Sequence, residues 1–258
     1  MKETKILCWN VNGIRAASRH GFLEWLYRES LDILCLQETK AHPEQLGRDL
    51  QEPHGYHAYW NYPERKGYSG VATFTREKPL RVLNDFGVQD FDIEGRVIIS
   101  EYPQFILFNV YFPNGKKDES RLRYKMDFYD FFLDFVESLR QKGGKLIICG
   151  DFNTAHKEID LARPKENENV SGFLPIERAW MDKLVAHGYI DTFRHFNKEP
   201  NQYTWWDLKS RARERNVGWR IDYFFVTENL LGSVSKAFIM PEVMGSDHCP
   251  IGIILKTP

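Results

Sequence analysis

Polar residues of a few types stand where the apolar segments of this chain end. The segment "KLIICGDFN" is apolar until it reaches Asp151 and Asn153, and "ILCLQETK" reaches Glu38 in the same way. The rest of this set, which we call the strand-end polar residues, is Asn10, Asn12, Tyr111, Asn114, Asp222, Asp247 and His248. No Ser or Cys in the sequence lies in the context of an activated nucleophile. Because loops on a rigid scaffold commonly carry binding sites, we expect these side chains to meet.

The strand-end polar residues favour a metal site that acts on a phosphate. Carboxylates and amides, with few His or Cys, are typical of a hard cation, so we expect Mg²⁺ with Mn²⁺ as a substitute. A zinc site would need more His or Cys at closer spacing. A carboxylate such as Asp222 beside His248 would fix the imidazole tautomer and favour its charged form, which suits a phosphate oxygen. Asp151 and Asn153, two residues apart on an extended stretch, could hold a water molecule.

Each of these residues also has an ordinary structural interpretation. Asn12 and Asn114 both precede Gly, and Asn-Gly is a common turn dipeptide. Asp151 could cap a helix that begins near residue 154, Asp222 could form a core salt bridge, and Tyr111 could be a packed aromatic residue. The functional interpretation depends on the whole set, because polar residues of these types recur at six separate strand ends.

Short apolar runs rich in Ile, Val and aromatic residues recur along the chain without a linker or a change of composition. They predict strands at residues 5–10, 33–38, 57–62, 70–75, 96–102, 105–112, 146–150, 202–206, 220–227 and 250–255. Helical periodicity and end signals predict helices at 22–29, 123–141 and 175–187. Many strands with few helices favour an α/β fold of two packed sheets with helices outside, in a single domain spanning residues 1–258. The similar segments "ILCWNVNG" and "IICGDFNTA" suggest two halves whose strand ends share one edge.

Composition limits the kind of partner. The chain has 258 residues, and 35 Lys and Arg against 36 Asp and Glu give a net charge of -1. An anionic partner must therefore be held by a local basic patch. The densest basic run, residues 207–216, follows Trp205 and Trp206 directly, and we expect one of these rings in the core and the other near a nucleic-acid groove.

Cysteine context and targeting signals indicate the compartment. Cys8, Cys35 and Cys149 lie in apolar runs, and no C-x-x-C pair occurs, which favours buried free thiols. No apolar stretch approaches the roughly 20 residues of a membrane span, and the N-terminus has no export signal. We expect a cytoplasmic protein that makes no membrane contact and, in a prokaryote, associates with the nucleoid. The phosphate loop G-x-x-x-x-G-K-S/T, the dinucleotide fingerprint G-x-G-x-x-G and the nucleophile elbow G-x-S-x-G are all absent.

The residues also carry a family resemblance over nearly the whole chain, from about residue 5 to residue 255. The matching segments are "WNVNGIRA", "DILCLQETK", "GYSGVA", "EGRVI", "VYFPNG", "CGDFNTAHKEIDL", "GFLPIERAW", "YTWW", "NVGWRIDYFFV" and "GSDHCPI". Together they resemble the exonuclease III family of abasic-site endonucleases, within the endonuclease/exonuclease/phosphatase superfamily, and look most like its bacterial and archaeal members. The sequence lacks the long N-terminal extension of some eukaryotic members.

The resemblance implies a four-layer α/β sandwich of two mixed sheets flanked by helices. It implies Mg²⁺-dependent cleavage of the phosphodiester on the 5′ side of an abasic nucleotide, which leaves a 3′-hydroxyl and a 5′-deoxyribose phosphate. A 3′→5′ exonuclease or 3′-repair side activity is expected, and incision at other damaged nucleotides such as deoxyuridine is left open. The partner would be double-stranded DNA with an abasic or otherwise damaged site, bound by a monomer.

Metal binding and water activation follow from the resemblance by position. Glu38 would be the principal metal ligand, and Asn10, Asn12 and Asp247 would belong to the same cluster. Asn12 stands where some members carry an Asp. Asp151 would align or deprotonate the attacking water.

Phosphate and sugar contacts are implied in the same way. His248, oriented by Asp222, would contact the scissile phosphate. Tyr111 and Asn114 would hold the phosphate or the leaving oxygen, and Asn153 would assist Asp151. The expected DNA-binding residues are Arg15, Tyr68, Arg96, Lys116, Lys117, Lys125, Trp205, Lys209, Arg213 and Trp219. Lys117 and Lys209 occupy the positions from which some relatives insert Arg and Met into the duplex.

Two other functions are weighed against this one. A DNA-binding module without catalysis would be expected to have lost Glu38, Asp151 or His248, and all three are present. A phosphatase or phospholipase of the same superfamily would keep the metal site and act on small phosphoesters. The number of metal ions and the identity of the general base stay open at this point.

Overall fold

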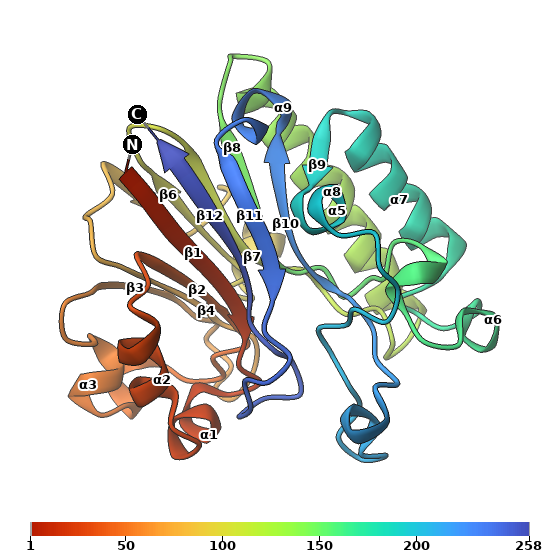
Figure 1. The fold of residues 1–258 in the computed structure, drawn as a ribbon, viewed down its shortest axis with the longest axis horizontal. Coiled ribbons are helices and arrows are strands. Elements are labelled where there is room, and N and C mark those ends of the chain that lie inside the picture. Colours follow the sequence, from red (N-terminus) through yellow and green to blue (C-terminus); the bar gives the residue numbers. More distant parts are fainter. Residues whose placement is uncertain (1, 258) are drawn as a thin grey trace.

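Two mixed β-sheets of six strands each pack face to face in the computed structural model, which describes residues 2–257. Helices lie on the outer side of each sheet, so the molecule has four layers (Figure 1). The predicted α/β sandwich of two packed mixed sheets is confirmed.

The first sheet has the strand order β11-β12-β1-β2-β4-β3. β1 and β2 are parallel, and the other neighbours are antiparallel. Its strands are β1 (Lys2–Asn10), β2 (Ile33–Gln37), β3 (His57–Asn61), β4 (Val71–Thr75), β11 (Val234–Ile239) and β12 (Ile251–Thr257). The second sheet has the order β5-β6-β7-β8-β10-β9, with β7 and β8 as its parallel pair. Its strands are β5 (Arg81–Leu83), β6 (Val97–Glu101), β7 (Ile106–Tyr111), β8 (Leu146–Asp151), β9 (Tyr189–Asp191) and β10 (Asp222–Thr227).

Amphipathic helices cover the outer faces of the sheets. α1 (Ile14–Arg19) and α2 (Phe22–Glu29) pack on the first sheet, and α5 (Glu119–Arg140) and α7 (Pro175–Ala186) pack on the second. The shorter helices are α3 (Arg48–Gln51), α4 (Gln89–Asp92), α6 (Pro164–Asn167), α8 (Thr192–Phe196) and α9 (Glu228–Leu231), and three 3-10 turns span Pro43–Gln45, Glu158–Asp160 and Ala212–Arg215. Among the described helices, none is both long and apolar enough to cross a bilayer.

The core between the sheets explains the apolar strand segments. Both faces of the central strands are buried, because one face meets the other sheet and the other meets a helix. Cys8, Cys35 and Cys149 lie in the cluster between the sheets, and all four cysteines are buried and free, as predicted. Every residue of β2 and β8 is buried, so exposed and buried positions do not alternate along them. Their sequences are therefore continuous apolar runs.

Several predicted boundaries need correction. Residues 202–206 form no strand, because this segment makes isolated bridges, from Trp205 to Trp219 and His248. Three short or edge strands, β5, β9 and β11, were not predicted. α5 begins at Glu119 and not at residue 123, since the Asp118 side chain accepts a hydrogen bond from the Arg121 N–H and caps the helix. The helix at 22–29 is confirmed, and α7 ends one residue before its predicted end.

Candidate active site

The central strands of both sheets bring their polar ends to one edge of the sandwich. Asn10 ends β1 and Asp151 ends β8, and the amide Nδ2 of Asn10 donates to Asp151 Oδ2 at 2.8 Å across the two sheets. The same amide group donates to Glu38 Oε1 at 3.0 Å, just beyond β2. The shared edge expected from the two similar segments is therefore present in the structure.

Glu38, Asp151 and His248 form the centre of the site. One ligand atom from each lies within 4.8 Å of the other two, although the residues are far apart in the sequence. The backbones of Glu38, Asn12 and Asn153 have φ angles of 50°, 45° and 52°, in the left-handed region that residues other than glycine rarely adopt. Such strained conformations cluster at functional sites, where the surrounding structure holds them in place.

Lys40 neutralises the Glu38 carboxylate. Its Nζ lies 2.7 Å from Glu38 Oε2, and it also donates to Asn12 Oδ1. Burial alone would raise the pKa of Glu38, but the Lys40 charge and the hydrogen bonds from Asn10 and Tyr111 outweigh burial and lower that pKa. Lys40 was not among the predicted site residues, and its only signal in the sequence is its place two residues after Glu38 in "QETK".

His248 and Asp222 form a buried ion pair. The distance from His248 Nδ1 to Asp222 Oδ2 is 2.8 Å, and Thr204 Oγ1 donates to the same oxygen at 2.6 Å. Burial would lower the pKa of His248, but the Asp222 charge and hydrogen bond raise it to about 10. The raised pKa favours the imidazolium form, whose Nδ1–H is held by Asp222 and whose Nε2–H suits a phosphate oxygen.

Asp151 lies beside the imidazolium. His248 Nε2 is 3.9 Å from Asp151 Oδ2, and the Asn153 backbone N–H donates to Asp151 Oδ1 at 2.7 Å. Burial and the Asp222 charge raise the pKa of Asp151 to about 7, against the opposing effect of His248. A carboxyl group with a pKa near neutrality can act as a general base at neutral pH. No helix begins between residues 151 and 157, so the alternative role of Asp151 as the cap of a helix starting near residue 154 is wrong.

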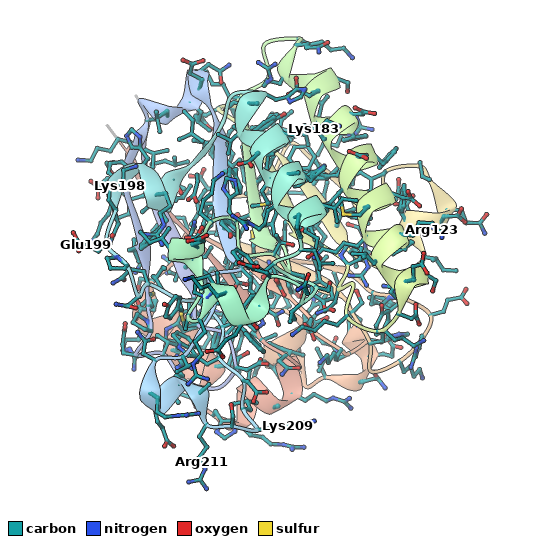
Figure 2. All side chains as sticks on the ribbon, turned by 90° about the vertical axis from the view of Figure 1, so that its right-hand side faces the viewer. Arg123, Lys183, Lys198, Glu199, Lys209 and Arg211 are labelled. Atoms are coloured by element: carbon teal, nitrogen blue, oxygen red, sulfur yellow. The ribbon has the colours of Figure 1, made fainter. Side chains whose placement is uncertain are left out.

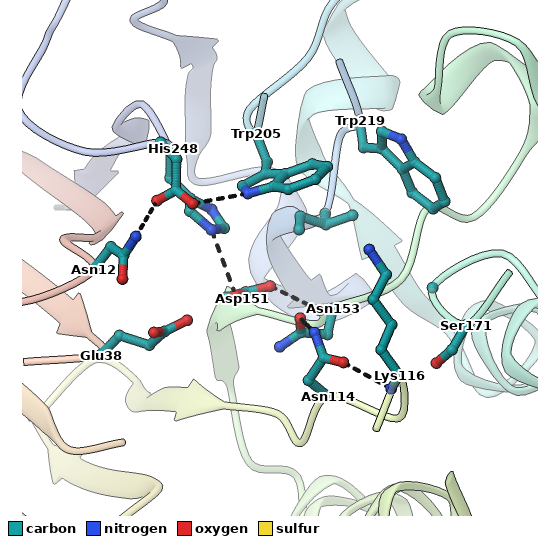
Figure 3. Close-up of a pocket in the computed structure, with 13 residues that line it drawn as sticks. Asn12, Glu38, Asn114, Lys116, Asp151, Asn153, Ser171, Trp205, Trp219 and His248 are labelled. Atoms are coloured by element: carbon teal, nitrogen blue, oxygen red, sulfur yellow. Dashed lines mark hydrogen bonds and ion pairs between the residues drawn. The ribbon is translucent and has the colours of Figure 1, made fainter. Parts of the chain in front are cut away.

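Tyr111 and Asn114 lie on the β7 side of the site. Tyr111 Oη donates to Glu38 Oε1 at 2.7 Å, and burial followed by the Glu38 charge raises the pKa of Tyr111 well above its ordinary value. The phenol is therefore neutral and remains a donor. Asn114 Nδ2 donates to Asn153 Oδ1 at 2.8 Å, so both amides face the cavity in one fixed arrangement (Figure 3).

Asn12 and Asp247 form a separate polar pair at the rim. Asn12 Nδ2 donates to Asp247 Oδ1 at 2.9 Å, and Trp205 Nε1 donates to Asp247 Oδ2 at 3.1 Å. Asp247 is not in the three-residue cluster that the described residues form around Glu38. The amide oxygen of Asn12 already accepts from Lys40. In this arrangement neither residue has the same direct access to a metal as Glu38.

The donor set fits a hard divalent cation. The partly buried Glu38 carboxylate and the buried Asp151 carboxylate both accept from the Asn10 amide, and their oxygens are close enough to bind one metal ion. Mg²⁺ and Mn²⁺ prefer oxygen donors of this type. Among the described residues, no Cys belongs to the cluster of Glu38, Asp151 and His248. The site can therefore hold a divalent metal ion at Glu38.

A cavity of about 240 Å³ opens beside these groups (Figure 3). Trp205 and Trp219 form one wall, with ring planes at 84° and centroids 6.4 Å apart. The Lys116 ammonium lies 5.3 and 5.7 Å from the two ring centroids. Trp206 is buried, as expected for one of the two rings, and Trp205 is partly exposed. That Trp205 lies near a nucleic-acid groove stays a prediction.

Ser171 and Gly172 form another wall of this cavity, and the sequence analysis missed both. Gly172 has a φ of 102°, and a Cβ there would lie 3.2 Å from the Trp219 ring and 3.3 Å from the Asn153 carbonyl oxygen. Glycine is needed at this position to let the wall approach the ring. Gly172 opens the segment "GFLPIERAW", which carries part of the family resemblance, and Ser171 directly precedes that segment.

Two predicted DNA-binding residues are buried. Lys125 is 0% exposed, and its Nζ is bound by Glu177, Thr154 and the Asn153 carbonyl. Arg96 is 2% exposed and donates to Glu94, Tyr68 and the Tyr111 carbonyl. The prediction that these two side chains contact DNA directly is therefore wrong in this structure. The sequence alone does not show whether a basic side chain is exposed to solvent.

The other predicted DNA-binding residues differ in exposure. Arg213 is partly buried, and its guanidinium donates to the carbonyls of Pro241, Val243 and Ser246 and stacks on Trp206. It therefore joins two loops and has little freedom to reach DNA. Tyr68 is partly exposed, Trp205 and Trp219 face the cavity, and the exposed cationic side chains are those of Arg15, Lys116, Lys117 and Lys209.

Known proteins share both the sequence and the fold. Residues 7–248 match the Endonuclease/Exonuclease/phosphatase family. The chain is 45% identical to an exodeoxyribonuclease of Bacillus subtilis over 98% of this chain and 99% of that one. It is 40% identical to a DNA-(apurinic or apyrimidinic site) endonuclease of Dictyostelium discoideum over 98% of this chain and 71% of that one.

Solved structures agree with this relation. An AP endonuclease from Archaeoglobus fulgidus superposes with a TM-score of 0.88 at 27% identity, covering 98% of this chain and 100% of that one. A 3′ phosphatase from Neisseria, solved bound to a product DNA hairpin, gives 0.89 at 28% identity with 98% and 100% coverage. The chain belongs to the endonuclease/exonuclease/phosphatase family, as its own motifs indicated.

Proposed function

We propose that this protein is a Mg²⁺-dependent DNA repair endonuclease that hydrolyses the phosphodiester on the 5′ side of an abasic nucleotide. The products would be a 3′-hydroxyl and a 5′-deoxyribose phosphate. The observation that carries the proposal is the convergence of Glu38, Asp151 and His248 beside a tryptophan-lined cavity. The nuclease names of the full-length relatives from Bacillus and Dictyostelium support the same activity class.

Glu38 would be the main ligand of the metal, with Asp151 near enough to share it. When bound, the ion would neutralise charge on the non-bridging phosphate oxygens. Lys40 would then give up its contact with Glu38 Oε2. Asn10 would keep the two carboxylates at a fixed separation, because its amide group donates to both.

Water activation and charge stabilisation would come from side chains of the chain itself. Asp151 would take a proton from the attacking water, which it can do at neutral pH because its pKa is raised to about 7. His248 would donate from Nε2 to a phosphate oxygen, since Asp222 holds its other nitrogen. Tyr111 has a single O–H, which donates to Glu38 Oε1 in this structure, and it would have to release Glu38 to donate to a phosphate or leaving oxygen.

Damage recognition would use the cavity between Trp219 and Ser171. An abasic deoxyribose must leave the duplex to reach Asp151, and the missing base lowers the cost of that extrusion by a few kcal/mol. The exposed side chains of Arg15, Lys116, Lys117 and Lys209 would hold the DNA backbone. We propose double-stranded DNA as the partner, a monomer as the active form and the cytoplasm as the location. We also propose a 3′→5′ exonuclease side activity. A duplex that contains deoxyuridine would test whether other damaged nucleotides are incised.

The test uses a duplex with one synthetic abasic site, incubated with the protein and Mg²⁺ or with EDTA. We expect a nick only with the metal, and a rate lowered by a factor of about 10² or more in Glu38→Gln, Asp151→Asn and His248→Ala. Lys183→Ala on α7 is the matched control, because its exposed side chain lies outside the site. Rates near the wild-type value in all three variants would overturn the assignment. Phosphate release from small phosphoesters without nicking would favour the phosphatase alternative.

A further inference from the structure

A second cavity lies on the outer side of the second sheet, beside β9 and α8. Its volume is about 450 Å³, which is within the range of small-molecule sites. None of its lining residues lines the cavity of the candidate active site. Ile159, Val185 and Ile190 supply apolar surface, and the cationic lining residues are Lys157, Arg194, Lys198 and Arg220.

The carboxylates in these walls are already occupied. Asp160 Oδ1 accepts from the guanidinium groups of Arg194 and Arg220, and Asp160 Oδ2 accepts from the Lys157 backbone N–H. Asp191 Oδ1 accepts from the Arg194 backbone N–H, and Asp191 Oδ2 accepts from Arg220 Nη2 at 2.6 Å. Every carboxylate oxygen of the walls therefore has a donor, and a ligand finds little acceptor capacity here.

Hydrogen-bond donors, in contrast, are in surplus. Arg220 is 1% exposed, and its Nη1 has no hydrogen-bond partner among the described residues. The Lys157 ammonium pairs with Asp182, and the Lys198 ammonium donates to the Arg194 carbonyl. Since an ammonium group carries three N–H bonds, each lysine has further donors to offer. Arg220 Nη1 is itself closed to solvent, so Arg220 contributes positive charge beneath the cavity wall, and the two lysine ammonium groups are the donors that a ligand rich in acceptors can reach.

We propose that this cavity binds a small organic phosphate monoester. A phosphate group has three acceptor oxygens and two negative charges, which match the ammonium donors of Lys157 and Lys198 and the positive charge of the buried Arg220. The organic part would lie on the apolar surface of Ile159 and Val185. A simple anion would use the donors and leave this apolar surface uncovered.

The cavity is joined to the candidate active site through the chain segment before β10. Arg220 lies between Trp219 and Ile221, which both line the active-site cavity. The Arg220 backbone N–H donates to the Asp160 carbonyl at 2.6 Å, and Leu161 bridges to Trp219. A charged ligand that binds over Arg220 is therefore expected to perturb the Trp219 indole, which provides a second readout of binding.

The test is a calorimetric titration of the whole protein with thymidine 5′-monophosphate, in EDTA and without DNA, with the Trp219 indole N–H followed by NMR. We expect saturable binding of the nucleotide. Thymidine should bind at least tenfold more weakly, because it lacks the phosphate. The double variant Lys157→Ala/Lys198→Ala should weaken binding at least tenfold, and Val185→Trp should block it by filling the cavity. Figure 2 labels Lys198 and also Lys183 on α7, where Lys183→Ala is the control that should keep wild-type affinity.

Three results would overturn the proposal. They are no binding at about 10 mM nucleotide, equal binding of thymidine, or unchanged binding in both the double variant and Val185→Trp. Because the titration contains neither metal nor DNA, its failure would leave the proposed nuclease function untouched. Loss of nicking in the abasic-site assay would likewise say nothing about this cavity.

Discussion

Asp222 controls the charge of His248 because the two side chains are buried together. In the folded chain, burial favours the neutral imidazole, and the nearby carboxylate favours the cation and prevails. Thr204 donates to the same carboxylate oxygen that binds His248 and so holds Asp222 in place. The protonated form of His248 is thus favoured at neutral pH mainly by Asp222, with smaller contributions from Asp151 and Asp247.

Asp222→Asn is predicted to move the alkaline limb of the pH profile of kcat/KM to lower pH. If the protonated His248 is required, activity falls as pH rises through its pKa, which is raised to about 10 in the wild type. Without the negative charge, burial dominates, the pKa falls, and the limb should lie at least about one pH unit lower. The profile is measured on the abasic-site duplex from pH 6 to about 10.5. An unchanged alkaline limb with only a uniform loss of rate would contradict this role.

At the scale of elements, a buried ion pair fastens α5 and α7 to two loops of the site. Lys125 on α5 and Glu177 on α7 are both 0% exposed on their side chains and lie 2.6 Å apart. Glu177 also accepts from Ser171 Oγ and from the Gly172 backbone N–H, and Lys125 donates to the Asn153 carbonyl. The pair therefore sets the position of both cavity walls, although neither residue lines the cavity.

Lys125→Met is predicted to destabilise the fold by about 3–5 kcal/mol, because it leaves the Glu177 charge buried without its partner. The free energy of unfolding is measured by urea titration. Lys183→Met, which breaks the exposed pair with Asp130 at 3.0 Å, is the matched control and should cost at most about 1 kcal/mol. Equal effects of the two variants would show that burial of the pair has no energetic role.

The loop of residues 207–216 carries basic residues with two different tasks. Lys209 is exposed, and Figure 2 shows it with Arg211 at the end of this protruding segment. Arg213 instead binds the carbonyls of Pro241, Val243 and Ser246, next to Asp247. The exposed residue is free to meet a phosphate, and the partly buried one fixes the loop against the site.

Lys209→Ala should reduce the slope of log K against log salt concentration for duplex binding by about 1, because one phosphate contact is lost. Arg213→Ala should leave that slope unchanged and lower kcat, since the loop before His248 loses its support. Binding is measured by fluorescence anisotropy at several salt concentrations in EDTA. A slope reduced by Arg213→Ala and not by Lys209→Ala would reverse the two assignments.

At the scale of the whole molecule, the two sheets share one core. The cluster between them joins Ile6 and Cys8 of β1 to Ile147 and Cys149 of β8. Separating the two sheets would expose this apolar surface to water and would lose the free energy gained by burying it. The active site spans the same junction, because Asn10 of one sheet binds Asp151 of the other.

A single cooperative unfolding transition is therefore predicted for the chain, in agreement with the one-domain interpretation of the sequence. Far-UV circular dichroism and tryptophan fluorescence should give coincident urea curves, and sedimentation should give a monomer of 30.4 kDa. Tryptophan fluorescence reports on both halves, since Trp9 belongs to β1 of the first sheet and Trp180 of α7 packs on the second. Separate transitions would mean that the halves fold as two domains.

Local sequence patterns determined much of this protein. Apolar runs predicted the central strands, since residues buried on both faces must be apolar whatever the topology. The strand-end polar residues predicted the chemistry, because carboxylates, amides and a carboxylate-paired histidine have intrinsic preferences for metals and phosphates. The edge strands β5, β9 and β11 were not predicted, because they are short or partly exposed and their hydrophobic periodicity is weak.

Only the tertiary structure decided which polar groups are partners and which are solvated. Asn10 and Asp151 are 141 residues apart, and their contact depends on how the two sheets pack, which no local pattern encodes. For the same reason Lys125 looked like a DNA ligand in the sequence and is a buried structural cation in the fold. The type of a side chain sets what it can do, and its burial and neighbours, fixed by distant parts of the chain, set what it does.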